Sequence, residues 1–328
     1  MPRNDHVSAM NIDPMTIFER SEIASAHRLN RILAYLPRYH TGRRPNARLL
    51  NALIGIGQKF APSVQSKDVS LSAFQITVPS GKREVRLLRP PAPGSAIFLH
   101  FHGGAWVLGN ARLDDRWNAS IASKADVTVA APDFHLATDD HLDRTIDDAV
   151  AVTEWILDHL DQLGAKTLFI GGESSGAHLA ACSLVRLAAR RPLNGLCGFL
   201  SFCGAFDMAG SDSLKQADGR SLILDAPSAL RNLERLTATL PAGAVHSPEV
   251  SPYLADLSGM PPALFIGGAL DPIRDDSQKI YDRWAGCNGN ATILIVPEAP
   301  HGFERLPTRL ADKTLAYACE WMKKVAYA

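Results

Sequence analysis

This chain of 328 residues has no excess of charge of either sign, no long apolar run and no evident cysteine pairs. Its 34 Lys and Arg residues balance 34 Asp and Glu residues, so the formal net charge is zero and gives no electrostatic reason to expect nucleic-acid binding. No apolar run approaches the ~20 residues that a transmembrane helix needs, so we expect no transmembrane segment. The first residues lack the apolar centre of a signal peptide.

The five cysteines are odd in number and show no paired metal-binding spacing; they stand at positions 182, 197, 203, 287 and 319. This usage fits a reducing compartment better than a disulfide framework, so we expect a cytoplasmic protein. An apolar fraction of 46% and a charged fraction of 21% are typical of a globular chain with a sizeable core. The length allows one large α/β domain with a small accessory piece, or two domains.

From about residue 96 onward, strand-like apolar runs alternate with segments of helical periodicity. This alternation predicts a mostly parallel central sheet with helices on both faces. The predicted strands cover 95–101, 127–131, 167–170, 263–268 and 291–296. Helical apolar faces are predicted over 149–163 and 315–325. Upstream, the runs 74–78 and 85–88 flank Pro79-Ser80-Gly81-Lys82 and predict a hairpin.

The segment Gly172-Glu173-Ser174-Ser175-Gly176 joins the strand at 167–170 to a helix predicted over 175–189. A serine between two glycines on a strand-to-helix turn is typical of the nucleophile elbow of α/β-hydrolases. Glycine at both flanks relieves steric clash in a sharp turn and leaves the Ser174 hydroxyl clear of the backbone. The pattern therefore predicts Ser174 as a nucleophile; the alternative is an inert turn serine.

Two further side chains follow later strands in the order Ser, acid, His. Asp271 comes directly after the strand at 263–268, and His301 lies in the loop after the strand at 291–296. Both positions are at the carboxyl ends of strands, where open α/β sheets place their sites. A serine hydroxyl needs a base at neutral pH, and an acid would hold the imidazole in the right tautomer. We therefore predict His301 as the base and Asp271 as its partner, with Asp275 and Asp276 as rival acids.

A glycine-rich turn, His102-Gly103-Gly104-Ala105-Trp106, follows the strand at 95–101. The main-chain N–H groups of Gly103, Gly104 or Ala105, together with that of Ser175, would then stabilise an oxyanion. We expect His102 to brace this turn through its ring. Trp106 either touches substrate or packs in the core.

The chain resembles the hormone-sensitive lipase-like family of esterases. The resemblance rests, in chain order, on Phe101–Gly109, Asp133–Ala137, Gly172–Ala177, Ser247–Pro252, Asp271–Asp275 and His301–Phe303. It covers roughly residues 75–325 and implies an α/β-hydrolase fold with a Ser174, Asp271, His301 triad. Ala105 stands where the family has a third glycine, and Glu173 where it usually has aspartate; both leave the reaction class unchanged. The implied activity is hydrolysis of small, short-chain carboxylic esters through an acyl-enzyme, without cofactor or metal.

In that family, segments outside the strand–helix alternation form a helical cap above the triad. Here residues 1–70 and 208–247 are such segments, and Asp13-Pro14 predicts a helix start in the first of them. We therefore expect an N-terminal cap arm at 1–70, core at 71–207 and 248–328, and a cap insertion at 208–247. A cap of this kind would exclude water from the site.

Several alternatives stay open at this point. The substrate could be a long-chain lipid, a lactone or an amide, or the fold could serve a non-catalytic ligand-binding protein. A metal could be held near His100 and His102, or near His135, Asp139, Asp140 and His141, although neither group has a familiar spacing. No Asp or Glu occurs between Ala24 and Lys67. That basic segment is either a solvated face or a peripheral contact with anionic membrane. A homodimer is compatible with the sequence.

Overall fold

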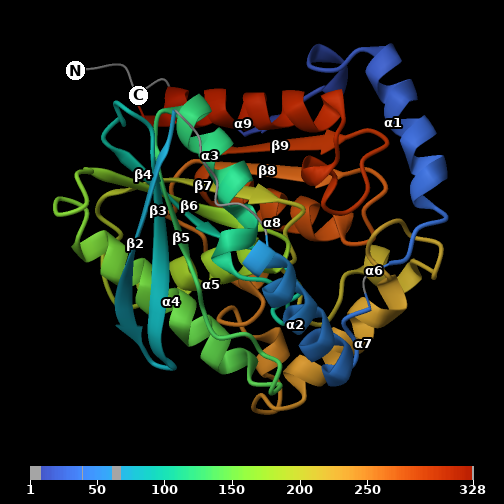
Figure 1. Ribbon diagram of the computed structural model, residues 1–328, viewed down its shortest axis with the longest axis horizontal. Helices are drawn as coiled ribbons and strands as arrows, with labels where there is room; N and C mark the ends of the chain where they lie inside the picture. The colour runs from blue at the N-terminus through green and yellow to red at the C-terminus, as the bar shows by residue number, and fades with distance from the viewer. Residues whose placement is uncertain (1–8, 39, 61–67, 327–328) are drawn as a thin grey trace.

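The computed structural model describes residues 9–38, 40–60 and 68–326. In this part of the chain the strands form one nine-stranded sheet in the order β1-β9-β8-β7-β6-β4-β5-β3-β2 (Figure 1). The strands are β1 (Met10–Asn11), β2 (Ser70–Val78), β3 (Gly81–Arg89), β4 (Ala96–Phe101), β5 (Thr128–Pro132), β6 (Thr167–Glu173), β7 (Leu196–Phe202), β8 (Ala263–Gly268) and β9 (Ala291–Val296).

Neighbouring strands from β1 to β5 in this order are parallel, whereas the pairs β5–β3 and β3–β2 are antiparallel. The predicted strands and the hairpin are therefore confirmed. All residues of β4 and β8 are buried, which explains why they read as continuous apolar runs. Sequence analysis did not predict β7 or the two-residue β1, which adds to the edge of the sheet beside β9.

Helices cover both faces of the sheet. The core helices are α3 (Asp115–Ala125), α4 (Leu142–Asp158), α5 (Ser175–Ala188), α8 (Arg274–Asn288) and α9 (Arg309–Ala326). Alternate residues of β4 point to opposite faces: Ile97 and Leu99 pack in the cluster with α4, α5 and α8, whereas Phe98 packs with α3 and α9. The α/β sandwich therefore has two apolar layers, one on each side of the sheet.

The remaining helices are α1 (Arg20–Leu33), α2 (Arg44–Phe60), α6 (Asp212–Gln216) and α7 (Ala226–Thr237). Short 3₁₀ turns are η1 (Pro14–Thr16), η2 (Ala111–Asp114), η3 (Ala244–His246), η4 (Pro252–Leu254) and η5 (Phe303–Arg305). Asp13 accepts a hydrogen bond from the Met15 N–H and caps η1, so the predicted helix start at Asp13-Pro14 opens only a 3₁₀ turn. Within the described ranges, no helix combines the length and the apolar character needed to cross a bilayer.

The N-terminal arm and the 208–247 insertion contact each other. Asp140 forms ion pairs with Arg44 of α2 and with Arg235 of α7. The Gly42 N–H also donates to the Ser228 hydroxyl at 2.9 Å. Figure 1 shows α6 and α7 on the side of the molecule toward which β8 and β9 point. Two segments far apart in sequence thus lie together near the carboxyl ends of the strands.

Candidate active site

Ser174 lies on a sharp turn between β6 and α5, with φ 52° and ψ −120°. This conformation is costly for a residue with a side chain, and such strain gathers at functional sites. The glycines around Ser174 are required by close packing. A Cβ on Gly172 would lie 2.3 Å from the Phe101 carbonyl oxygen, and one on Gly176 would lie 2.0 Å from the same atom. The elbow is therefore pressed against the end of β4.

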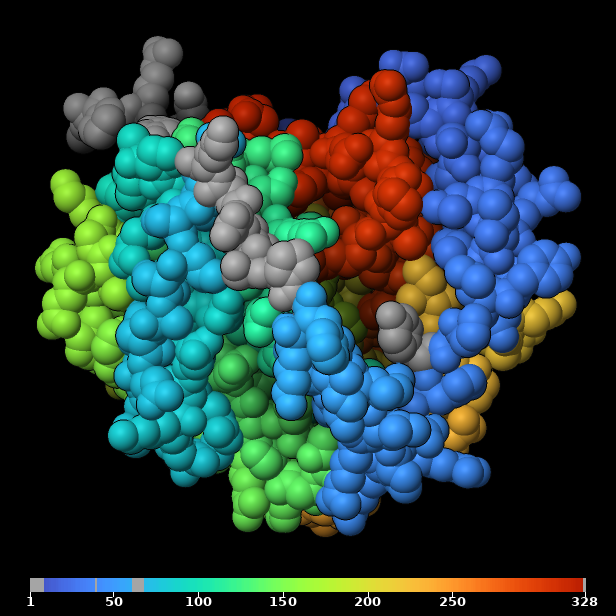
Figure 2. Space-filling model, in the orientation of Figure 1, coloured from blue at the N-terminus to red at the C-terminus, as the bar shows by residue number. Residues whose placement is uncertain are grey.

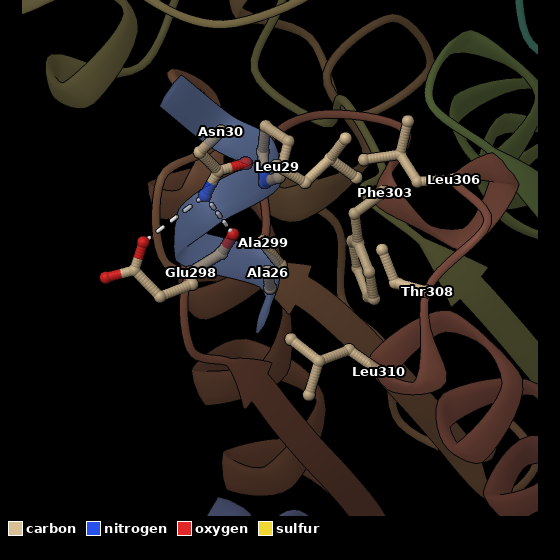
Figure 3. A pocket seen from close by; sticks show the side chains of 10 residues that line it. Ala26, Leu29, Asn30, Glu298, Ala299, Phe303, Leu306, Thr308 and Leu310 are labelled. Carbon is tan, nitrogen blue, oxygen red and sulfur yellow. Dashed lines mark hydrogen bonds between the residues drawn. The ribbon is translucent and has the colours of Figure 1, made fainter. Parts of the chain in front are cut away.

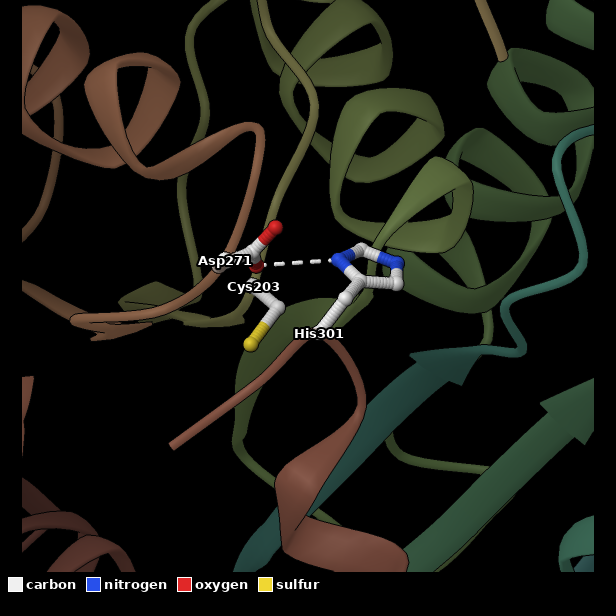
Figure 4. Close-up of side chains that lie close together, drawn as sticks. All are labelled: Cys203, Asp271 and His301. Carbon is white, nitrogen blue, oxygen red and sulfur yellow. Dashed lines mark hydrogen bonds and ion pairs between the residues drawn. The ribbon is translucent and has the colours of Figure 1, made fainter. Parts of the chain in front are cut away.

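The structure brings Ser174, His301 and Asp271 into one hydrogen-bonded relay. The Ser174 Oγ lies 3.0 Å from His301 Nε2, and His301 Nδ1 lies 2.9 Å from Asp271 Oδ2. Figure 4 shows the imidazole turned toward the carboxylate. The Ile273 N–H donates to the other oxygen of Asp271, which fixes the carboxylate. These three side chains come from the ends of β6, β8 and β9.

The rival acids are used elsewhere. Asp275 accepts a hydrogen bond from the Ser213 N–H at 3.0 Å. Asp276 accepts from the N–H groups of Phe206 and Asp207 at 2.6 and 2.8 Å. Only Asp271 among the three carboxylates lies within hydrogen-bonding distance of the imidazole.

The electrostatics around His301 favour its charged form. Burial opposes protonation of the ring and is the largest single influence on it. Attraction to Asp271, the hydrogen bond to that carboxylate, and the charges of Glu304 and Glu173 outweigh burial and raise the pKa of His301 above its ordinary value. The same partners would stabilise an imidazolium formed when the ring takes a proton from Ser174.

The predicted oxyanion turn has free donors. Among the described residues, no hydrogen bond uses the main-chain N–H of Gly103, Gly104, Ala105 or Ser175. Gly104 has φ +124°, and a Cβ there would lie 2.1 Å from the Leu108 carbonyl oxygen, so this position needs glycine. Ala105 also has a positive φ, 54°, which alanine tolerates at a modest cost.

Side chains around the turn hold it in place. His102 Nδ1 lies 2.7 Å from the Gly103 carbonyl oxygen, and its ring stacks on Phe134 with centroids 4.4 Å apart. This is the bracing role predicted for His102. Asn232 of α7 donates to the Ala105 carbonyl oxygen at 3.1 Å. Trp106 is buried and donates to His178 Nδ1 at 3.0 Å, so it packs in the core.

Sequence analysis missed a charged cluster behind the nucleophile. Arg305 donates two hydrogen bonds to the carboxylate of Glu173, at 2.8 and 2.6 Å. Arg305 also forms an ion pair with Asp114 at 3.1 Å and lies over the Trp117 ring at 4.2 Å. Because Glu173 precedes Ser174 and Arg305 follows His301 by four residues, this pair joins the nucleophile turn to the histidine loop. The only sequence signal was an acid beside the predicted nucleophile.

The pKa values in this cluster are strongly shifted. Burial alone would raise the pKa of Glu173, but the charge and hydrogen bonds of Arg305 lower it to about 2. Burial and repulsion from Glu173 raise the pKa of Glu304 to about 8. The same two causes raise the pKa of Asp114 to about 7. Glu173 therefore carries the negative charge that pairs with Arg305.

One group in the described chain has the geometry to hold a cation: Cys203, Asp271 and His301 (Figure 4). Burial, followed by the charges of Glu304 and Asp271, raises the pKa of the Cys203 thiol well above its ordinary value. A protonated thiol is a poor metal ligand, and the other two members bond to each other. Of the histidines considered for metal, buried His100 contacts the rings of Phe98 and Trp117, with centroids 5.5 and 5.0 Å away, and His135 bonds to Asp139 at 3.0 Å.

Two cavities border this region. One of about 330 Å³ is lined by Asp271 and Leu270 on the core side and by residues of α6 and the following loop, including Ser213, Ala217 and Ser221. The other, of about 10 Å³, lies between α1 and the loop after β9 (Figure 3). The second has room for about one water at most. Only the larger cavity adjoins the relay.

The sequence pattern of the α/β hydrolase fold family matches residues 98–305, and the chain belongs to that family. The match begins within β4 and ends at Arg305, so it includes the oxyanion turn, the elbow, Asp271 and His301. The predicted fold class is therefore confirmed.

Similar proteins are esterases. Ethyl acetate hydrolase of Pseudomonas putida is 28% identical over 249 residues, which are 73% of this chain and 78% of that protein. Esterase LipW of Mycobacterium marinum superimposes with a TM-score of 0.80 at 24% identity, over 95% of this chain and 100% of that one. Brefeldin A esterase, a bacterial homologue of human hormone-sensitive lipase, gives a TM-score of 0.74 at 20% identity, over 96% of each chain. The resemblance to hormone-sensitive lipase-like esterases is thus confirmed, and the chain is a carboxylesterase-like α/β-hydrolase.

Proposed function

We propose that this protein is a serine carboxylesterase that hydrolyses small, short-chain esters through an acyl-enzyme. The observation that carries the proposal is the continuous relay from Ser174 Oγ through His301 to Asp271, with hydrogen bonds of 3.0 and 2.9 Å. A hydroxyl, a base and an orienting acid at such distances are what nucleophilic acyl transfer needs.

In the proposed reaction, His301 Nε2 takes the Ser174 proton while Oγ attacks the ester carbonyl carbon. The tetrahedral intermediate collapses when His301 returns the proton to the leaving alcohol, and an acyl-serine remains. A water molecule, deprotonated by His301, then attacks the acyl carbon, and Ser174 leaves as the free hydroxyl. Asp271 holds the ring and stabilises its charged form in both halves of the cycle. Every step uses groups of this chain and water, so the proposal needs no cofactor or metal.

The negative charge of each intermediate would form beside the glycine turn. The N–H groups of Gly103, Gly104, Ala105 and Ser175 have no partner among the described residues, which supports their role as oxyanion donors. Each such donor is worth roughly 100- to 1000-fold in rate when it is aimed at the oxyanion.

The N-terminal arm and the 208–247 insertion are proposed to form a cap over the site. Their mutual contacts through Asp140, and the position of α6 at the 330 Å³ cavity beside Asp271, support this assignment. A cavity of that size suits a small acyl or alcohol group. We also propose a cytoplasmic location, since the five cysteines are free thiols.

The test is a series of aryl esters from acetate to palmitate, measured as initial rates with the wild type and with Ser174→Ala. We expect maximal activity on short chains and none above background in Ser174→Ala. A maximum at palmitate would show a lipase instead. Wild-type protein with no turnover on any ester of the series would refute the esterase assignment and favour a ligand-binding role.

A further inference from the structure

Helix α2 exposes an apolar face that a surface helix normally buries. Its large apolar side chains recur at helical spacing and are exposed to solvent: Leu49 (61%), Leu53 (55%), Ile56 (53%) and Phe60 (84%). Positions four, three and four residues apart lie on one face of a helix, so these side chains form one stripe. We call them the α2 stripe. Surface helices normally bury such a stripe against the core.

The opposite face of α2 holds amide side chains that bond to the body of the protein. Asn51 donates to the Val107 carbonyl oxygen at 2.7 Å and accepts from the Gly109 N–H at 3.0 Å. Gln58 exchanges two hydrogen bonds with Asn110, at 2.8 and 3.0 Å. These hydrogen bonds, together with the packing of Ala47 and Leu50 on the core, hold the helix in an orientation that exposes the stripe.

Basic side chains border the α2 stripe. Arg48 and Lys59 lie eleven residues apart, about three helical turns, so they fall on the same flank of the stripe. Both are exposed, and neither is in an ion pair with any residue that the structure describes. The sequence from 24 to 67 contains no acidic residue that could neutralise them. Figure 2 shows α2, in light blue, on the outer surface of the molecule.

We propose that the α2 stripe docks on an anionic lipid surface. Apolar side chains with cationic neighbours fit the boundary between acyl chains and anionic headgroups, where long basic side chains reach outward to phosphate. A second copy of this chain is a weaker fit. In a two-fold symmetric dimer each patch meets itself, so Arg48 and Lys59 would face like charges. The proposal stands apart from the proposed esterase activity, since binding is measured without turnover.

The experiment is cosedimentation of the full chain with vesicles of phosphatidylglycerol and, separately, of phosphatidylcholine, at low and at high salt. We expect binding to phosphatidylglycerol that weakens as salt rises, and little binding to phosphatidylcholine. The oligomeric state of the same protein preparations is measured without lipid.

Two variants separate the contribution of the basic side chains from that of the α2 stripe. Arg48→Gln/Lys59→Gln should weaken partitioning to phosphatidylglycerol by about 30-fold, because each basic residue near an anionic surface strengthens membrane binding by about fivefold. Leu53→Ser/Ile56→Ser/Phe60→Ser should weaken it by at least about tenfold by removing inserted apolar surface. The controls are Lys82→Gln/Lys324→Gln and Leu113→Ser, which remove exposed basic and exposed apolar side chains in other elements. Thermal melting verifies that each variant is folded.

Three results would overturn the proposal. One is the absence of sedimentation with phosphatidylglycerol at low salt. Another is an equal loss of binding in the control variants, which would place the contact elsewhere. The third is a dimer in solution that Leu53→Ser/Ile56→Ser/Phe60→Ser converts to a monomer, since the stripe would then bind a second copy.

Discussion

Replacing Arg305 tests whether the charged cluster behind the elbow positions the reacting groups. Arg305 holds Glu173 through two hydrogen bonds. Glu173 directly precedes Ser174, and Arg305 lies four positions after His301. The contact between Ser174 Oγ and His301 Nε2 is 3.0 Å, and such a bond is lost beyond about 3.5 Å. A relative shift of the two loops by about 0.5 Å therefore suffices to break the relay. In Arg305→Met we expect such a shift, since Glu173 and Asp114 are left without their cation.

The expected size follows from burial. The Arg305 side chain is 28% exposed and that of Glu173 is 13% exposed, so the pair is largely buried. Breaking such a pair costs about 3 kcal/mol of stability. A misplacement approaching 1 Å costs about 100-fold in rate. We expect kcat of Arg305→Met to fall by about 10- to 100-fold with KM little changed. Arg305→Lys keeps the charge but not the bidentate hydrogen bond, so its kcat should lie between those of the wild type and Arg305→Met.

The assay measures kcat and KM on an aryl acetate together with the melting temperature. Arg190→Met is the matched control, since Arg190 pairs with Glu154 at the surface, where a pair contributes at most about 1 kcal/mol. Glu173→Gln and the double variant complete a cycle, in which we expect the two losses in kcat to be clearly less than additive. An unchanged kcat in Arg305→Met, together with a lower melting temperature, would refute the positioning role and leave a purely structural pair.

Three more predictions follow from the site. The kcat/KM should decline as pH falls through a value above 6.5, because protonated His301 cannot take the serine proton. Asp271→Asn should lower kcat by about 10,000-fold and move that decline to lower pH. A pH profile of the wild type and the variant checks both. Gly176→Ala should cost about 1–3 kcal/mol on melting, since its Cβ would meet the Phe101 carbonyl, whereas Gly286→Ala, with open space around it, should be neutral or stabilising. Folding disfavours the ionised form of Glu304, so the protein should lose stability as pH rises from 4.5 to about 8. Glu304→Gln should remove this loss, whereas exposed Glu234→Gln should not. Melting curves in which the advantage of Glu304→Gln is constant across that range would contradict this assignment.

Local sequence determined the elements on which the site is built. Apolar runs such as 95–101 and 263–268 predicted buried parallel strands, because strands covered on both faces are apolar throughout. Glycines on either side of Ser174 predicted the elbow, since few other residues fit beside the end of β4. The chain order Ser, acid, His then indicated which side chains meet at one edge of the sheet.

Other features depend on contacts that no local pattern encodes. The sequence predicted Asp271 but left Asp275 and Asp276 as rivals, and only the tertiary structure shows which carboxylate lies beside the imidazole. The Glu173–Arg305 pair joins residues 132 positions apart. The apolar side chains of α2 recur at helical spacing, but contacts with the body of the protein, among them the hydrogen bonds of Asn51 and Gln58, decided which face is outside. The sequence by itself therefore determined most of the strands, the elbow and the chemical groups of the site. Tertiary structure alone decided their partners and orientation, because hydrogen bonds and charges act between neighbours in space.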